Sequence, residues 1–180
     1  MAQVCLVGSD DVNLRYELLS RETARNALVT YDLREPFENT IQLQTVSLGA
    51  AVALLNDLNW YLVRFTDAAF VKVPSISESE WLSRELATAV RDDEMAPENT
   101  GRFLKVYGIV ADEEPADSED ADQSDADADD EDDAGETQDQ PPRLVEPMLL
   151  TRTGDTIPAY DLREVAETLI VRVTESEFGA

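Results

Sequence analysis

The first part of the chain contains four stretches whose apolar positions differ in spacing. Residues 2–7 form a β-branched apolar run that predicts a buried strand, and residues 11–28 have the apolar positions of a helix. Residues 40–46 alternate between apolar and polar side chains, which predicts a strand with one solvated face. Residues 48–58 are rich in alanine and leucine and predict a second helix.

Further along the chain, two short runs are rich in aromatic and β-branched side chains. These runs, residues 60–65 and 69–73, predict the two strands of a hairpin. Ser77 and Glu80 then have the spacing of a capping box, which predicts the start of a third helix. Residues 103–110 predict another strand.

The order of these elements over about 40–110 is β-α-β-β-α-β. This order is typical of a ferredoxin-like core, in which two helices cover one face of an antiparallel sheet. The first strand and helix precede that core as a β-α unit. We therefore expect an α+β fold, a mixed two-layer sandwich. The alternative is a three-layer α/β fold with a partly parallel sheet, because the first elements would also start such a sheet.

A strongly acidic stretch divides the chain. Residues 111–140 hold 16 of the 39 acidic residues and no basic residue, so they cannot bury enough apolar surface to offset the entropy of ordering. We expect an α/β body over 1–110, an acidic disordered linker over 111–142 and a C-terminal β-rich segment over 143–180. Forty residues cannot form a core alone, so this segment is expected to dock on the body by adding strands to a sheet edge.

The net charge of −25 is high, and the basic residues are mostly arginine, with twelve arginines and two lysines. An acid-rich, lysine-poor surface is the pattern expected of a halophilic protein, since molar salt screens the repulsion between like charges. The alternative is an ordinary acidic protein with an acidic tail. No leader or membrane-spanning pattern is apparent, so we expect a cytoplasmic protein with no membrane partner.

The composition excludes many kinds of catalytic site. The sequence has no histidine and a single cysteine, Cys5, which lies in an apolar run and is expected to be buried. A Ser-His-Asp triad, a Cys-His pair, a zinc site with histidine ligands and a CxxC redox pair are therefore excluded. Glycine-rich phosphate-binding motifs and the nucleophile elbow do not occur. We predict no catalytic residue, metal or cofactor.

Four residues remain candidates for ligand binding: Ser9, Asp10, Asp11 and Arg34. The first three follow the first predicted strand and precede a helix, where a parallel sheet would place a crevice and where two carboxylates suit Mg²⁺. The alternative role for these residues is capping of the helix. Arg34 belongs to the pentapeptide YDLRE, which recurs at 160–164. The repeat could be a repeated binding element, a duplicated structural motif or a coincidence.

A cluster of arginines on the first helix, Arg15, Arg21 and Arg25, could contact phosphate groups, although interleaved glutamates favour a salt-bridged surface. The tryptophans Trp60 and Trp81 are expected in the core rather than as stacking platforms for bases. Nucleic acid is therefore a weaker candidate partner that the sequence does not exclude.

Four stretches carry a resemblance to a known family: VCLVGSDDVNLRYELLSRETARNAL, YDLREPFENT, LLNDLNWYLVRF and EWLSRELATAVRD. Over roughly residues 1–110 they resemble an uncharacterised family of small haloarchaeal proteins. The resemblance implies a halophilic archaeal and cytoplasmic setting, and it implies no activity.

The leading functional hypothesis is a non-enzymatic protein-interaction or regulatory module that binds a protein partner. The alternative is a small-molecule or nucleotide-binding enzyme that uses Asp10 and Asp11 with Mg²⁺, and the weaker alternative is a nucleic-acid-associated factor. A parallel sheet with a deep crevice beside Gly8 would favour the enzyme. An antiparallel sheet without such a crevice would favour the interaction module.

Overall fold

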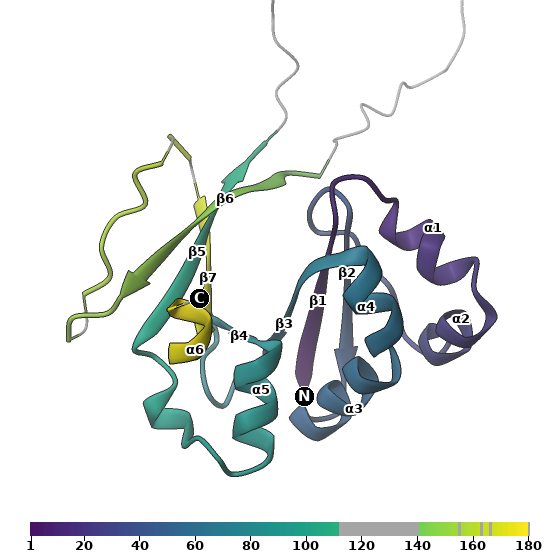
Figure 1. Ribbon diagram of the computed structural model, residues 1–180, viewed down its shortest axis with the longest axis horizontal. Helices are drawn as coiled ribbons and strands as arrows, with labels where there is room; N and C mark the ends of the chain where they lie inside the picture. The colour runs from purple at the N-terminus through teal and green to yellow at the C-terminus, as the bar shows by residue number, and fades with distance from the viewer. Residues whose placement is uncertain (112–140, 155, 163, 166, 180) are drawn as a thin grey trace, which may run out of the picture.

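A seven-stranded mixed sheet runs through the computed structural model, which describes residues 1–111, 141–154, 156–162, 164–165 and 167–179. The strands follow the order β2-β1-β3-β4-β7-β5-β6 (Figure 1). Only the pair β4 and β7 is parallel among these neighbours. The strands are β1 (Ala2–Gly8), β2 (Thr40–Thr45), β3 (Thr66–Lys72), β4 (Trp81–Ser83), β5 (Phe103–Val110), β6 (Arg143–Thr151) and β7 (Glu167–Val173). The predicted α+β class is confirmed.

The order of strands within the sheet differs from that of a ferredoxin-like core. The chain order β-α-β-β-α-β does occur over 40–110, with two consecutive helices in the first connection. However, β1 lies between β2 and β3, and β7 lies between β4 and β5. A ferredoxin-like sheet uses only the four strands of the motif. The ferredoxin-like arrangement is therefore wrong, because strands from both ends of the chain complete this sheet.

The second predicted helix, over 48–58, is found almost as expected, whereas the first is divided in two. The helices are α1 (Leu14–Leu19), α2 (Glu22–Leu28), α3 (Leu48–Asp57), α4 (Asn59–Phe65), α5 (Arg84–Arg91), the 3₁₀ helix η1 (Pro97–Asn99) and α6 (Glu175–Phe178). The single helix expected over 11–28 is split at Arg21, whose backbone is extended. The buried pairs Leu14/Leu18 and Ala24/Leu28 would point about 80° apart on a continuous helix. The break allows both pairs to face the core.

The hairpin predicted around residue 67 is also wrong. Residues 60–65 lie in α4, and β3 begins directly after it at Thr66. The aromatic and β-branched composition favours a strand, but Leu58 and Leu62 are both buried and have the i, i+4 spacing of a helix. The packing of Leu58 and Leu62 on α3 and on the sheet outweighs the preference of the neighbouring residues for a strand.

The helix predicted from the capping box begins later than expected. The Ser77 hydroxyl does accept a hydrogen bond from the Glu80 backbone at 3.0 Å. However, Trp81 and Leu82 then form β4, and their side chains enter different cores on opposite faces of the sheet. Helix α5 starts only at Arg84, and the hydroxyl of Ser83 caps it by accepting from the amide of Leu86 at 3.2 Å.

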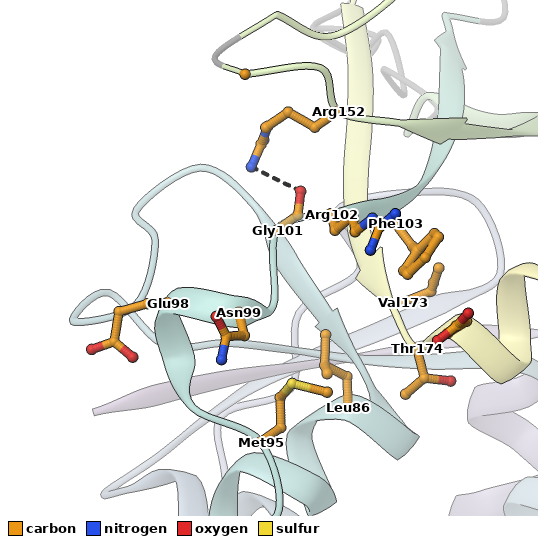
Figure 2. Close-up of a pocket in the computed structure, with 12 residues that line it drawn as sticks. Leu86, Met95, Glu98, Asn99, Gly101, Arg102, Phe103, Arg152, Val173 and Thr174 are labelled. Carbon is orange, nitrogen blue, oxygen red and sulfur yellow. Dashed lines mark hydrogen bonds between the residues drawn. The ribbon is translucent and has the colours of Figure 1, made fainter.

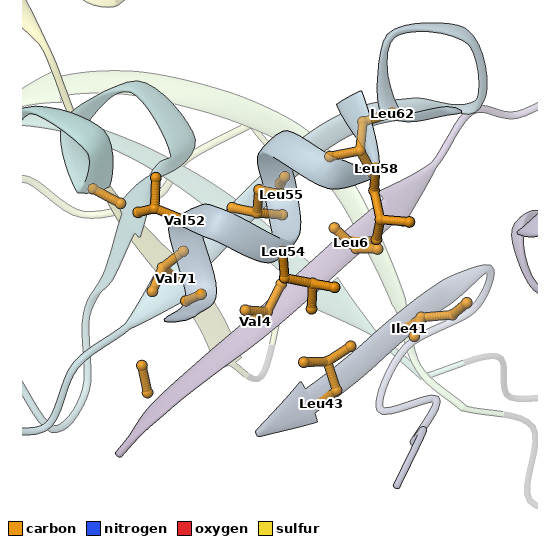
Figure 3. Close-up of a cluster of buried hydrophobic side chains, with 14 of the residues drawn as sticks. Val4, Leu6, Ile41, Leu43, Val52, Leu54, Leu55, Leu58, Leu62 and Val71 are labelled. Atoms are coloured by element: carbon orange, nitrogen blue, oxygen red, sulfur yellow. The ribbon is translucent and has the colours of Figure 1, made fainter. Parts of the chain in front are cut away.

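Both faces of the sheet are covered by apolar side chains. On one face, helices α1 to α5 pack on β1, β2, β3 and β4 in the largest core, part of which is shown in Figure 3. Val4 and Leu6 of β1 lie at its centre, beneath Leu55 and Leu58. On the other face, β1, β3 and β4 share a second core with β5 and β7 through Cys5, Phe70, Trp81, Tyr107, Leu169, Val171 and Val173. Trp81 is thus a core residue, as predicted.

The C-terminal part of the chain supplies an interior strand and an edge strand. β7 pairs with β5 over seven register positions and with β4 over two, and β6 pairs with the outer side of β5. The sequence predicts only edge strands here, whereas β7 closes the gap between β4 and β5. The predicted linker lies almost entirely outside the described residues, and the three-part division of the chain stays a prediction. No helix of the described residues has the length and apolar character needed to cross a membrane.

Candidate functional site

The predicted binding residues after β1 lie in a loop that Asn39 holds in place. The side chain of Asn39 donates to the carbonyl groups of Ser9 and Val12 and accepts from the amide of Leu14, all within 2.9 Å. Asn39 adopts a positive φ of 54°, a conformation that asparagine tolerates better than most residues. At Gly8 an added Cβ would lie 2.5 Å from the Asn39 amide nitrogen. This loop geometry explains why glycine ends the strand.

The two aspartates of this loop lie at the surface of the molecule. Asp10 and Asp11 are exposed, and the Ser9 hydroxyl donates to the carboxylate of Asp67 at 3.0 Å. Among the described residues, no group of three or more acidic or cysteine side chains is placed to hold a metal ion. Asp10 lines a hollow of about 340 Å³. The role of this loop in ligand binding stays a prediction.

Arg34 lies at a different place from the loop. It lines a smaller hollow of about 260 Å³ beside Gln3 and Gln42, and its guanidinium is 3.5 Å from the carboxylate of Asp32 in an exposed pair. The structure therefore does not bring Arg34 together with Ser9, Asp10 and Asp11 in one pocket.

The two copies of YDLRE occupy different environments. Tyr31 packs at the edge of the largest core, whereas Tyr160 packs over the outer face of β5 and donates to the carbonyl of Glu146 at 2.7 Å. Residues 160–162 form no helix. Both tyrosines anchor a connecting segment on a neighbouring core.

A charge cluster that the sequence does not reveal joins the C-terminal strands to the body. The Glu80 carboxylate accepts two hydrogen bonds from Arg152 at 2.6 and 2.7 Å and one from Arg172 at 2.8 Å. Arg172 also donates to the hydroxyl of Thr100 at 2.9 Å, and Arg152 to the carbonyl of Gly101 at 3.2 Å. The side chain of Glu80 is only 12% exposed. We call Glu80, Arg152 and Arg172 the Glu80 cluster.

The electrostatics of this cluster favour an ionised carboxylate. Burial alone would raise the pKa of Glu80, but the hydrogen bonds and charges of Arg152 and Arg172 outweigh it and lower the pKa. Two guanidinium groups share one carboxylate, so the cluster carries a net positive charge. The two arginines lie 72 and 92 positions from Glu80 in the chain, which is why no local pattern could have predicted the cluster.

A pocket of about 520 Å³ opens beside the Glu80 cluster (Figure 2). Leu86 and Met95 lie at one end of the pocket. Glu98 and Asn99 come from η1, Phe103 is the first residue of β5, and Arg102 directly precedes it. The C-terminal part of the chain contributes Arg152, Gly154, Val173, Thr174 and Glu175. The pocket therefore exists only where the two parts of the chain meet.

A surface on α4 combines an exposed tryptophan with two arginines. The Trp60 side chain is 49% exposed, so its prediction as a core residue is wrong. The guanidinium of Arg64 lies 3.8 Å from the centroid of its ring and that of Arg21 lies 5.6 Å away, within the range of cation–π attraction. Val63, 70% exposed, belongs to the same helix face. We call Trp60, Val63, Arg64 and Arg21 the Trp60 face.

The single cysteine is not a reactive group. Cys5 is buried, as predicted, and burial raises the pKa of its thiol to about 12. Since the thiolate is the nucleophilic form, this cysteine stays unreactive near neutral pH.

The fold and these sites define a mixed α+β protein whose central sheet is completed by its own C-terminal strand. Residues 2–109 match the model of a family of unknown function, DUF5804. The match spans more than half of the chain, and the protein belongs to this family. No curated protein and no solved structure matches the chain. The family match covers Glu80 and Trp60 but ends before Arg152 and β7.

Proposed function

We propose that this protein is a non-enzymatic interaction module that docks an acidic segment of a partner protein on the Trp60 face. The observation that carries the proposal is the half-exposed Trp60 ring, which lies beneath the guanidinium of Arg64 and near that of Arg21. Tryptophan and arginine are the residue types most enriched among those that dominate protein–protein binding energy. A ring held by two guanidinium groups loses little side-chain freedom when a partner covers it.

The charges of the Trp60 face favour an acidic partner. Arg64 donates to the Trp60 carbonyl at 2.8 Å, and within the described part of the chain it takes part in no salt bridge. Arg21 contacts Glu17 at 3.3 Å in an exposed pair that a partner carboxylate can replace at little expense. The face therefore presents positive charge on a chain whose net charge is −25. Apolar contact would come from Trp60 and Val63.

The same chemistry could stack a nucleic acid base, since aromatic rings and arginines bind single strands. Two arginines on one face neutralise few phosphates, however, and affinity for nucleic acid grows with the number of phosphates neutralised. A long polyanion would also meet the acidic remainder of the surface. A short acidic protein segment with an apolar anchor fits the Trp60 face better.

Fluorescence of Trp60 tests the proposal. The Trp81→Phe variant retains Trp60 as the only tryptophan. We expect a synthetic peptide of alternating aspartate and leucine to shift its emission saturably, while a peptide with lysine in place of aspartate leaves it unchanged. Replacing Arg21 and Arg64 by alanine should weaken binding about tenfold or more, because charge-assisted contacts of 1.4 kcal/mol or above are lost.

A matched variant controls for the loss of two positive charges. Arg91→Ala combined with Arg102→Ala removes two arginines away from the Trp60 face and should leave peptide affinity unchanged. Equal binding of the acidic and basic peptides, no binding of the acidic one, or tighter binding of oligothymidine would each overturn the proposal.

We further infer that the protein works in a cytoplasm of molar salt, from the excess of acidic residues and the scarcity of lysine. Salt at about 1 M reduces the Debye length to about 3 Å and so relieves repulsion across the acidic surface. The melting temperature of the full chain should therefore rise from low to molar KCl. A melting temperature that falls over this range would contradict the inference.

A further inference from the structure

The pocket beside the Glu80 cluster has an apolar end and a charged rim. Leu86 and Met95 lie together at the apolar end, and Val173 and the ring of Phe103 line it as well (Figure 2). Its volume of about 520 Å³ falls in the range of pockets that bind small molecules. A ligand with an apolar group could therefore bury that group here.

One part of the rim is positive. The Arg102 guanidinium lies 5.2 Å from the centroid of the Phe103 ring, which orients it beside the pocket. Arg152 also lines the pocket, and the cluster to which it belongs has one positive charge in excess. Gly101 permits this arrangement, since a Cβ there would lie 2.6 Å from the Arg152 guanidinium. The carboxylate of a ligand could therefore pair with a guanidinium group on this part of the rim.

Another part of the rim is negative. Glu98 comes from η1 and Glu175 from the start of α6, and both are exposed at the pocket. Neither has a salt-bridge partner among the residues that the structure describes. Two carboxylates at the rim would repel a phosphate or another simple anion, and they suit an ammonium group.

We propose that this pocket binds a small apolar zwitterion, an amino acid or dipeptide with an apolar side chain. The ligand carboxylate pairs with Arg102, its ammonium group pairs with Glu98 or Glu175, and its side chain lies against Leu86 and Met95. A ligand without a carboxylate has no group to pair with Arg102, and a ligand without an ammonium group has none to pair with Glu98 or Glu175. Either ligand therefore binds more weakly than the zwitterion. The pocket has room for a dipeptide.

Calorimetric titration of the full chain with L-phenylalanine, glycyl-L-phenylalanine, phenylpropionate and phenethylamine tests this proposal. We expect saturable binding of the first two, and at least tenfold weaker binding of phenylpropionate, which lacks the ammonium group, and of phenethylamine, which lacks the carboxylate. Arg102→Gln and the double variant Glu98→Gln/Glu175→Gln should each weaken binding of L-phenylalanine about tenfold, as expected for loss of one charge-assisted contact.

Two controls separate this site from the Trp60 face and from general loss of charge. Arg91→Gln removes an arginine outside the pocket, and Trp60→Ala removes the centre of the Trp60 face. Both should bind L-phenylalanine like the original chain, and thermal melting verifies that every variant is folded. Absence of binding by all four compounds, equal binding of the zwitterions and the singly charged analogues, or unchanged affinity in the pocket variants would overturn the proposal.

Discussion

The Glu80 cluster and the Trp60 face both contain arginines, yet these arginines have different surroundings. In the cluster, two guanidinium groups share a carboxylate that is only 12% exposed, and their hydrogen bonds connect the body to β6 and β7. On the Trp60 face, the guanidinium groups lie over an aromatic ring that is half in solvent. We expect the partly buried arginines of the cluster to stabilise the fold, whereas an exposed arginine on an aromatic ring is available to a partner.

Removal of the Glu80 carboxylate should have the largest effect. Glu80→Ala leaves Arg152 and Arg172 facing each other without a counter-charge in a partly buried site. We expect a loss of roughly 3 kcal/mol in the free energy of unfolding, the lower end of what breaking a buried pair costs. Urea unfolding in high salt measures it. Glu98→Ala, which removes an exposed glutamate nearby, serves as the control and should change stability by less than about 0.5 kcal/mol.

Replacement of Arg172 by lysine should have an intermediate effect. Arg172 donates to both Glu80 and Thr100, and the point charge of an ammonium group cannot reproduce this planar arrangement. We expect a loss of about 1–2 kcal/mol in the free energy of unfolding, since one charge-assisted hydrogen bond is lost. Arg64→Lys on the Trp60 face is the matched change. If both variants lose the same stability, the contrast between the two regions is wrong.

The pH dependence of stability should differ with and without the Glu80 carboxylate. Because the pKa of Glu80 is lower in the folded chain than in the unfolded chain, its contribution is present above the unfolded pKa and is lost as pH falls through the folded value. From about pH 5 downward, the original chain should therefore lose stability relative to Glu80→Gln. Parallel stability profiles of the two proteins over this range would contradict the predicted shift.

Truncation of Trp60 should have the smallest effect on stability. Trp60→Ala removes a half-exposed ring and leaves no buried cavity, so the free energy of unfolding should change by no more than about 0.5 kcal/mol. Trp81→Ala is the comparison, because Trp81 is 6% exposed and its truncation should cost about 3 kcal/mol or more. Chemical unfolding of both variants measures the difference. A large loss in Trp60→Ala would place Trp60 in the core after all.

Local patterns identified the strands whose faces the structure also buries. The run of residues 2–7, the alternation of 40–46 and the run of 103–110 all correspond to strands. Patterns failed where distant contacts compete with local preference. Residues 60–65 have a strand-like composition, but the burial of Leu62 beside Leu58 requires a helix. The Ser77–Glu80 pair was interpreted correctly only in part. Ser77 accepts the predicted hydrogen bond from the Glu80 backbone, but the Glu80 side chain binds Arg152 and Arg172.

The candidate sites divide in the same way. The sequence indicated Ser9, Asp10, Asp11 and Arg34 because these residues belong to short motifs of neighbouring positions. In the structure, Arg34 and Asp10 line two different hollows. The sequence could not point to the pocket beside the Glu80 cluster, whose lining comes from residues 86 to 175. Nor could it point to the Trp60 face, because the exposure of Trp60 depends on α4 being a helix.

By itself, the sequence determined the α+β class, the burial of Cys5, the position of the acidic stretch and the exclusion of the common histidine and cysteine chemistries. These properties follow from composition and from periodicity over a few residues. Only the tertiary structure decided that β7 enters the sheet between β4 and β5, that Glu80 binds two distant arginines and that Trp60 lies at the surface. Each of these features is stabilised by contacts between distant segments, and the free energy of such contacts outweighs local preference.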